Sequence, residues 1–281
     1  MEQERNTQKD KQMNARCVYV YTNEEELSRS VGDSLRQLLA ERGIRVPACF
    51  DDTVELLVCV GGDGTLLRGL HAFDFPDIPV AGINTGHLGF FQELQHDELH
   101  RLLDMCDGGS HSIQRHRLVR VTLLRNGGEP VCHKGLNDIV IKGSVSRITH
   151  LNLSIGDSFV EKFSGDGLVI ASPAGSTAYN YSLGGSIVDP RLNLLQVTPI
   201  APMNTTAFRC FTSSIVLPPD LEINIVPEFP HDRDVLVIVD GVEYTYQGVS
   251  KMIVDLSFQE VQLVRFQHYD FWNKVKSKFL Q

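Results

Sequence analysis

Two short segments of this chain are almost wholly apolar, and each runs directly into glycine-rich sequence. VELLVCV (residues 54–60) precedes GGDGT, and IPVAGIN (78–84) precedes TGHLGF. Strands with so few polar positions are buried on both faces, which is typical of a parallel sheet covered by helices. Because glycine allows tight turns, the sequence after each strand predicts a loop at the edge of that sheet.

Helix-like segments alternate with these strands, as an α/β domain requires. CVYVYT (17–22) predicts a strand, and a helix is expected to begin with Asn23 as its cap and to end at Gly43. Its spacing predicts a buried face that consists of Leu27, Val31, Leu35 and Leu38. TLLRGLHAF (65–73) and HDELHRLLDMC (96–106) predict two further helices.

The pattern changes near residue 110. Short strand-like runs then follow one another, from LVRVTLLR (118–125) to VQLVRF (261–266), which predicts antiparallel β-structure. The end of the chain, HYDFWNKVKSKFL, returns to an amphipathic helical pattern. The expected domains are a flexible tail (1–16), a Rossmann-like α/β nucleotide-binding domain with a parallel sheet (17–110), an all-β domain (111–263), and a C-terminal helical segment that returns to the first domain (264–281).

The composition excludes several classes of function. Asp and Glu number 35 against 26 Lys and Arg, which gives a net charge of −9 without a basic run suited to nucleic acid. No apolar stretch could span a bilayer, and the first 16 residues lack the apolar core of a signal peptide. We therefore expect no membrane partner and a cytoplasmic location. The six cysteines are scattered without a C-x-x-C pair, which favours buried free thiols.

The segment GGDGT places a carboxylate where a buried strand passes into a helix. Its glycines can present backbone N–H groups to phosphate oxygens, and the start of the helix adds a favourable dipole. It is not a P-loop, since G-x-x-x-x-G-K-[ST] is absent. Asp63 would repel phosphate unless it has another task, such as holding Mg²⁺ or accepting a hydrogen bond from a sugar hydroxyl. From these residues alone, Asp63 is either catalytic or a turn residue.

Two more glycine-rich segments extend this interpretation. GINTGHLGFF (82–91) follows the next strand, so in an open α/β sheet it reaches the same edge as Asp63. FSGDGLVIASPAGSTAYNYSLGG (163–185) holds Asp166 between glycines and many small hydroxyl side chains, which suit a ribose or amide ligand.

One short segment invites comparison with a metal site. HDELH (96–100) has the two histidines of the zinc motif H-E-x-x-H, but Asp97 takes the place of its glutamate. We expect a solvated helix face there, and no metal bound directly by protein ligands.

Five segments occur in the order and approximate spacing of the NAD kinases: GGDGT, NTGHLGF, LNDIVI, GDGLVIASPAGSTAYNYSLGG and VTPIAP. The chain resembles that family over roughly residues 55–245. GGDGT alone is shared with diacylglycerol and sphingosine kinases, whereas TAYNYSLGG resembles NAD kinases alone. The resemblance implies transfer of the terminal phosphate of ATP, or of inorganic polyphosphate, to the 2′-hydroxyl of the adenosine ribose of NAD, forming NADP. It also implies Mg²⁺ as a cofactor and a homodimer or homotetramer.

The resemblance implies roles for single residues as well. Asp63 would contact the acceptor hydroxyl as a base or as an orienting acceptor. Asn137 and Asp138 would hold the adenosine part of NAD, and Asp166 would accept a hydrogen bond from the nicotinamide carboxamide. The other implied substrate-binding residues are Gly61, Gly62, Gly64 and Thr65 in the first loop, Phe90 over adenine, Thr177 and Ala178 beside nicotinamide, Tyr179 and Ser182 facing ribose and phosphate, and Asp240 near the active site.

Three positions depart from the family pattern. Asp138 stands where the family has Glu, which shortens the side chain, Met203 replaces a common histidine, and Ala174 replaces a hydroxyl residue. Two rival functions stay open: a lipid kinase that shares GGDGT, and a non-catalytic sensor of dinucleotides. Asp63 argues against the sensor, because a pure binding protein has little use for a carboxylate beside phosphate.

Overall fold

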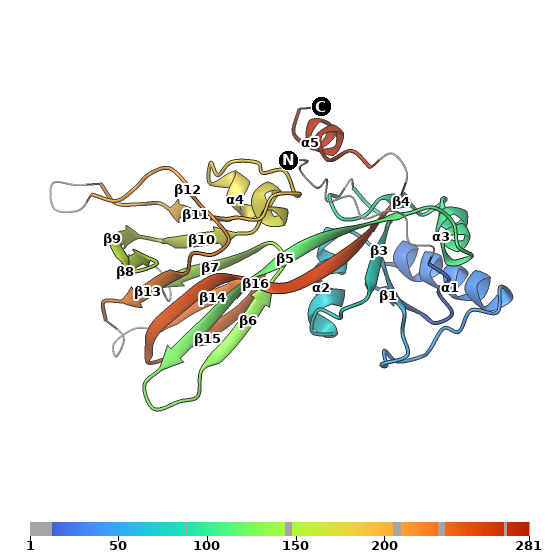
Figure 1. The fold of residues 1–281 in the computed structure, drawn as a ribbon, viewed down its shortest axis with the longest axis horizontal. Coiled ribbons are helices and arrows are strands. Elements are labelled where there is room, and N and C mark those ends of the chain that lie inside the picture. Colours follow the sequence, from blue (N-terminus) through green and yellow to red (C-terminus); the bar gives the residue numbers. More distant parts are fainter. Residues whose placement is uncertain are drawn as a thin grey trace, which may run out of the picture. The chain divides into compact units, whose positions relative to one another are not determined.

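The computed structural model describes residues 13–87, 89–143, 148–204, 209–229, 234–266 and 269–280. Its contacts divide the chain into two compact units (Figure 1). Unit 1 comprises Met1–Arg115 with Val261–Gln281, and unit 2 comprises His116–Glu260. Two long strands, β5 (Ser112–Arg125) and β16 (Val249–Arg265), therefore have residues in both units.

Unit 1 contains the predicted parallel sheet. Strands β1 (Val18–Thr22), β2 (Leu56–Val60) and β3 (Pro79–Asn84) pair in parallel, and β3 also pairs with β4 (Leu94–Gln95) and with the end of β16. Every residue of β2 is buried, as its apolar sequence predicts. Both faces of the strand are therefore covered, which confirms the α/β expectation.

Helix α1 (Glu26–Glu41) begins later than its predicted cap. Asn23 stays outside the helix, where its Oδ1 accepts a hydrogen bond from the Glu25 amide at 3.1 Å. Val31, Leu35 and Leu39 form the buried face, at intervals of four residues, whereas Leu27 is 45% exposed. The prediction for Leu27 was thus wrong, because Leu27 continues this stripe into the first turn of α1 but is exposed there, and that for Leu38 was incomplete, because Leu38 only flanks the core.

The next two helices also differ from their predicted bounds. Helix α2 (Asp63–Ala72) begins at Asp63, with Gly62 as its N-cap, so the aspartate lies in the first helical turn and not in the preceding loop. Helix α3 (Leu99–Cys106) begins after His96, so the two histidines of HDELH do not share a helix face. The expected solvated helix face there was wrong in this respect.

Both ends of the chain contribute to unit 1. Helix α5 (Phe271–Phe279) belongs to this unit, which confirms that the C-terminal helix returns to the first domain. Residues 1–12 of the predicted tail lie outside the described residues. The last part of that tail is ordered by its contacts, since Ala15 is 2% exposed and the Arg45 amide donates to the Arg16 carbonyl at 2.9 Å.

Unit 2 is built mainly from antiparallel strands, as predicted. One sheet has the order β12-β11-β10-β7-β14-β15, and its neighbouring strands pair antiparallel. Its strands are β7 (Asp138–Gly143), β10 (Gly167–Ala171), β11 (Leu195–Ile200), β12 (Ile215–Leu217), β14 (Val235–Val239) and β15 (Val242–Tyr246). Two short helical segments, η1 (Ala174–Thr177) and α4 (Tyr179–Ser182), follow β10.

The remaining strands of unit 2 supply the other side of its core. They are β6 (Val131–Gly135), β8 (Thr149–Ile155), β9 (Ser158–Gly165) and β13 (Ile223–Pro227), with parts of β5 and β16. Leu168 and Ile170 of β10 share one apolar cluster with Leu151 and Leu153 of β8, so alternate residues of the strands pack inward.

All six cysteines are free. Cys17, Cys59, Cys106 and Cys210 are buried, but Cys49 and Cys132 are exposed, so the prediction of buried thiols holds for four of the six. Within the described ranges, no helix combines the length and apolarity needed to cross a membrane.

Candidate active site

The first glycine-rich loop joins β2 to α2. Gly61 has a φ of +150°, and a Cβ there would lie 2.3 Å from Thr65 Oγ1, so the turn itself requires this glycine. A Cβ on Gly62 would meet nothing within 4 Å, and one on Gly64 would meet only Arg68 Nη1 at 3.5 Å. The space beside these two glycines is therefore open, whereas Thr65 is buried and only 2% exposed.

Asp63 joins this loop to the second one. Its Oδ2 accepts a hydrogen bond from the Phe90 amide at 2.9 Å, and its Oδ1 accepts one from the Phe91 amide at 3.0 Å. A Cβ on Gly89 would lie 2.3 Å from Asp63 Oδ1, so only glycine permits this approach. The predicted meeting of the two loops at one sheet edge is confirmed. Lys278 Nζ lies 3.8 Å from Oδ2, and the aspartate side chain is 24% exposed.

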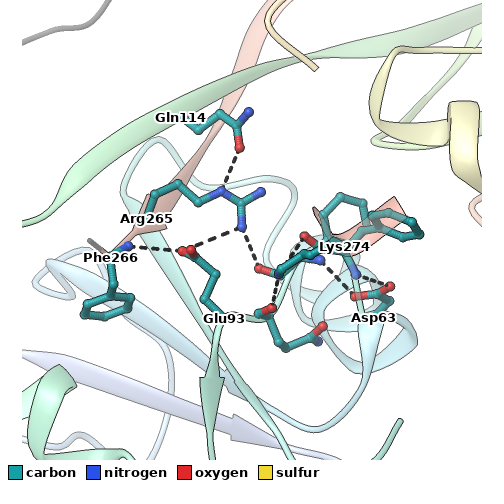
Figure 2. Close-up of polar contacts among 9 residues, drawn as sticks. Asp63, Glu93, Gln114, Arg265, Phe266 and Lys274 are labelled. Atoms are coloured by element: carbon teal, nitrogen blue, oxygen red, sulfur yellow. Dashed lines mark hydrogen bonds and ion pairs between the residues drawn. The ribbon is translucent and has the colours of Figure 1, made fainter. Parts of the chain in front are cut away.

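The carbonyls of the same loop are bound from the opposite end of the chain. Figure 2 shows Arg265 and Lys274 beside the loop that holds Asp63. Arg265 Nη1 donates to the Phe91 carbonyl at 2.9 Å, and Lys274 Nζ donates to the carbonyls of Gln92 at 2.5 Å and Phe90 at 3.4 Å. Asp63 therefore binds the amides of this loop, and Arg265 and Lys274 bind its carbonyls.

A buried carboxylate balances these two cations. Glu93 Oε2 lies 3.9 Å from Arg265 Nη1 and accepts a hydrogen bond from the Phe266 amide at 3.1 Å, while Arg265 Nε donates to Gln114 Oε1 at 2.6 Å. Burial raises the pKa of Glu93, and the charges of Arg265 and Lys274 oppose that rise. Burial, assisted by the charge of Arg265, lowers the pKa of Lys274 to about 8.

The Phe90 ring is covered by α5. It is 6% exposed, its centroid lies 5.9 Å from that of Phe271 and 5.8 Å from that of Phe279, and Lys278 Nζ lies 4.7 Å above it. Contact between this ring and adenine stays a prediction. It requires the side chains of α5 that cover the ring to move aside.

A cavity of about 590 Å³ lies beside Lys274 in unit 1. Its lining consists of Glu93, Glu98, Arg101, Tyr269, Asp270, Asn273 and Lys274, and does not include Asp63. The charged groups of this lining bind one another or the backbone, as in the Arg101–Glu98 pair at 2.8 Å and the hydrogen bond from the Asn273 amide to Asp270.

In unit 2, Asp240 organises the Asn137–Asp138 segment. Its Oδ2 accepts a hydrogen bond from the Leu136 amide at 2.7 Å, and its Oδ1 accepts from the amides of Asn137 at 2.7 Å and Asp138 at 3.2 Å. Asp240 has a φ of 47°, which places it at the turn between β14 and β15. Its carboxylate therefore shapes the segment that carries the two predicted adenosine contacts.

The two residues of that segment differ in environment. Asp138 is 5% exposed, and burial, with the nearby charge of Asp240, raises its pKa to about 7. The Oδ1 atom of Asn137 is buried and has no hydrogen-bond partner among the described residues. A buried acceptor without a partner costs free energy, so this amide is suited to a ligand donor.

The segment that follows β10 packs on the same place. Ser172 Oγ donates to the Leu136 carbonyl at 2.5 Å, and a Cβ on Gly175 would lie 2.0 Å from the Asn137 carbonyl oxygen. The predicted residues after it are the half-buried Thr177 and Ala178, Tyr179 at 42% exposure, and the exposed Ser182, whose Oγ donates to the Tyr179 carbonyl.

Asp166 does not join this group. It is exposed and immediately precedes β10, where Gly167 pairs with Lys142, whereas Ala171 at the other end of the strand pairs with Asp138. At about 3.3 Å per residue, the strand separates Asp166 from Asp138 by roughly 15 Å.

Comparison with known proteins decides the family. The ATP-NAD kinase N-terminal domain matches residues 1–109, and the ATP-NAD kinase C-terminal domain matches residues 136–266. The NAD kinase of Finegoldia magna is 33% identical over 95% of this chain and 99% of its own length. This chain belongs to the NAD kinase family.

Other NAD kinase relatives agree. The NAD kinase of Lactobacillus johnsonii is 34% identical over 94% of this chain and 97% of its own. Among solved structures, yeast NADH kinase complexed with NADH has a TM-score of 0.81 at 22% identity, covering 96% of this chain and 88% of that one. The NAD kinase from Archaeoglobus fulgidus in complex with ATP has a TM-score of 0.71 at 22% identity, covering 93% and 99%. These two structures show the same fold.

Several residues at this candidate site were missed in the sequence. Phe91 and Gly89 lie inside the second loop, but no pattern of neighbouring residues in the sequence indicates that their backbone contacts Asp63. Lys274 and Arg265 lie in an amphipathic helix and at the end of a strand, where cations are normally exposed. Gly175 lies in a glycine-rich segment, which was the one available hint.

Proposed function

We propose that this chain transfers the terminal phosphate of ATP to the 2′-hydroxyl of the adenosine ribose of NAD. The ribose oxygen forms a bond to the terminal phosphorus, the bond from that phosphorus to the bridging oxygen of ADP breaks, and the hydroxyl proton is lost. The products are NADP and ADP. Family membership over nearly the whole chain supports the reaction, and the setting of Asp63 carries the assignment of its site.

Asp63 is held in one orientation and keeps capacity for a ligand. An ionised carboxylate has about four lone-pair sites, and the amides of Phe90 and Phe91 use two of them. The remaining sites can accept a hydrogen bond from the ribose hydroxyl. Because phosphoryl transfer has a loose transition state, early removal of the hydroxyl proton is not required. Alignment of two bound reactants can lower the activation barrier by roughly 7–11 kcal/mol. This is more than the rate factor of about 10²–10⁴ that a general base supplies. We assign Asp63 as the orienting acceptor.

The open space beside Gly62 and Gly64 suits phosphate. Gly62 is the N-cap of α2 and Gly64 lies in its first turn, where free backbone N–H groups and the helix dipole favour an anion. Thr65, by contrast, is buried and its amide donates to the Gly62 carbonyl at 2.9 Å, so contact between this residue and substrate stays a prediction.

Unit 2 supplies groups for NAD. The unpaired Oδ1 of Asn137 and the carboxyl of Asp138 are suited to donors of the adenosine part, and the exposed Asp166 is suited to the carboxamide of nicotinamide. A dinucleotide has two distant ends, which agrees with the separation of these residues along β10. Thr177 and Ala178 would lie beside nicotinamide, and Tyr179 and Ser182 would face ribose and phosphate.

Mg²⁺ would enter with the phosphates of ATP. Within the described residues, no group of three His, Cys, Asp or Glu side chains is arranged to hold a metal ion. Mg²⁺ commonly binds through substrate phosphates and keeps several waters, so this arrangement fits an ion brought by the nucleotide and not a resident one. When bound, it would neutralise phosphate charge.

The test is NADP formation by the purified protein with ATP, Mg²⁺ and NAD, followed with an NADP-specific dehydrogenase. We expect Asp63→Asn to lower kcat by about 10²-fold, because a misaligned acceptor hydroxyl costs about that much. Asp52→Asn is the matched control, because Asp52 is exposed in the same unit, and its rate should stay within about twofold of wild type.

The other outcomes separate the rivals. Phosphorylation of diacylglycerol or sphingosine without NADP formation would replace the proposal with a lipid kinase. Binding of NAD without turnover would favour a dinucleotide sensor. Repeating the assay with polyphosphate in place of ATP identifies the donor, and light scattering tests the predicted homodimer or homotetramer.

A further inference from the structure

We propose that Lys274, supported by Arg265, is a positioning residue of the phosphotransfer site, which fixes the loop that orients Asp63. This inference rests on the proposed function of Asp63. Neither cation touches the reacting atoms in the proposal. Each acts through the backbone of the second glycine-rich loop, from helix α5 and from the end of β16.

Asp63 and the two cations bind the backbone of the same loop. The amides of Phe90 and Phe91 donate to the two oxygens of Asp63, and the carbonyls of the same two residues accept from Lys274 and Arg265, respectively. Lys274 also binds the carbonyl of Gln92. The peptide group between Phe90 and Phe91 is held on both sides, since its N–H donates to Asp63 and its carbonyl accepts from Lys274, so this amide cannot rotate away from Asp63 without breaking the second contact.

The environment makes these contacts strong. The side chain of Arg265 is 3% exposed and that of Glu93 is 9% exposed, so water screens their charges little. Hydrogen bonds from a cation to a carbonyl are stronger than neutral ones. Neutralising Lys274 would leave two loop carbonyls without this charged donor and would remove one of the cations near Glu93.

The charge of Lys274 depends on its neighbours. Asp63 from α2 and Glu93 from the loop after β3 favour its charged form, whereas Arg265 from β16 and Lys278 from α5 disfavour it. Tyr269 presents its ring 5.4 Å from Nζ, and Glu98, Arg101 and Asp270 face it across the cavity. Since burial brings the pKa of Lys274 to about 8, its proton is lost within the range of an ordinary assay.

Three variants test the inference. Lys274→Met removes the charge and keeps the length, Lys274→Arg keeps the charge, and Lys276→Met removes a charge from the exposed face of the same helix. We expect Lys274→Met to lower kcat roughly 10- to 100-fold with the KM for NAD and ATP changed less than about threefold, since misalignment acts on the transition state. Lys276→Met should match wild type.

The pH profile gives a readout that a purely structural role would not move. Wild-type kcat should fall as pH rises through about 8, the pKa of Lys274. Lys274→Arg, whose guanidinium stays charged, should move this alkaline limb to higher pH. If Lys274→Met does not fold, this profile decides: an unmoved limb in Lys274→Arg would overturn the proposal.

Hydrogen exchange separates this inference from the proposed function. The peptide that contains the amides of Phe90 and Phe91 should exchange at least about tenfold faster in Lys274→Met than in Lys276→Met, whatever reaction the protein catalyses. A wild type that forms no NADP would defeat the proposed function and leave this measurement standing. Equal exchange and equal kcat in the two methionine variants would defeat the positioning role and leave NAD kinase activity standing.

Discussion

At the scale of single residues, the chain sets two carboxylates in opposite environments. Asp63 is partly exposed and accepts two backbone N–H groups, whereas Asp138 is buried beside the charge of Asp240. With a pKa of about 7, Asp138 is half protonated near neutral pH. In the proposed function, it would therefore act toward NAD as a donor or as an acceptor, depending on pH.

Asp138 should also make stability depend on pH. Its folded pKa of about 7 lies above the ordinary aspartate value of 3.8, so the folded state binds the extra proton between these values. The free energy of unfolding contributed by this group is complete below pH 3.8 and is lost as pH rises through about 7. Asp138→Asn mimics the protonated form, so its advantage over wild type should grow over that range, to at most about 4 kcal/mol.

Denaturant unfolding at pH 5 and pH 8 measures this difference. Asp157→Asn, at an exposed turn of the same unit, should show no such growth. An Asp138→Asn variant that is equally stable relative to wild type at both pH values would contradict the assigned environment.

At the scale of elements, short helical segments are seated by close backbone approach and not by large side chains. Segment η1 can approach the Asn137–Asp138 segment because Gly175 has no side chain. A Cβ at this position would lie 2.0 Å from the Asn137 carbonyl oxygen. Asp240 and Ser172 hold the same segment from the other sides. The proposed adenosine contacts thus depend on how η1 packs against the Asn137–Asp138 segment.

Gly175→Ala should disturb that fit. We expect a loss of about 1–3 kcal/mol in the free energy of unfolding, because an added methyl group overpacks the contact, and a raised KM for NAD. Ser158→Ala is the control, since it places the same methyl side chain at an exposed position of β9 in the same unit. Thermal unfolding and NADP assays check both effects. Equal unfolding temperatures in the two variants would show that the backbone yields.

At the scale of the whole molecule, each unit has its own apolar core. The reactivity of a cysteine thiol shows whether its surroundings exclude water. Cys59 in β2 and Cys106 in α3 are buried, which raises the pKa of each thiol to about 12 and suppresses the reactive thiolate. Cys49 and Cys132 are exposed.

A disulfide reagent should therefore label two thiols quickly in the native protein, at Cys49 and Cys132, and all six after denaturation. Mass spectrometry of the labelled peptides identifies the sites. Fast labelling of Cys59 in the native state would mean that the parallel sheet opens readily.

Local sequence was enough to predict the architecture of both units. Apolar runs such as Leu56–Val60 predicted buried parallel strands, and the shift to short alternating runs predicted the antiparallel half, because these periods are properties of neighbouring residues. The family motifs similarly pointed to Asp63 and Asn137. The bounds of α1 and α2 were missed by a few residues, since caps depend on contacts outside the helix.

Only the tertiary structure shows what orients those residues. The Asp63 carboxylate meets amides 27 and 28 residues away, and Lys274 binds the Phe90 carbonyl from 184 residues away. Such contacts follow no local period, and a lysine in an amphipathic helix looks the same in sequence whether it faces water or a loop. Packing of α5 against that loop places Lys274 on the carbonyls of Phe90 and Gln92, beside Arg265 on that of Phe91, and this happens only when the C-terminal helix packs within unit 1.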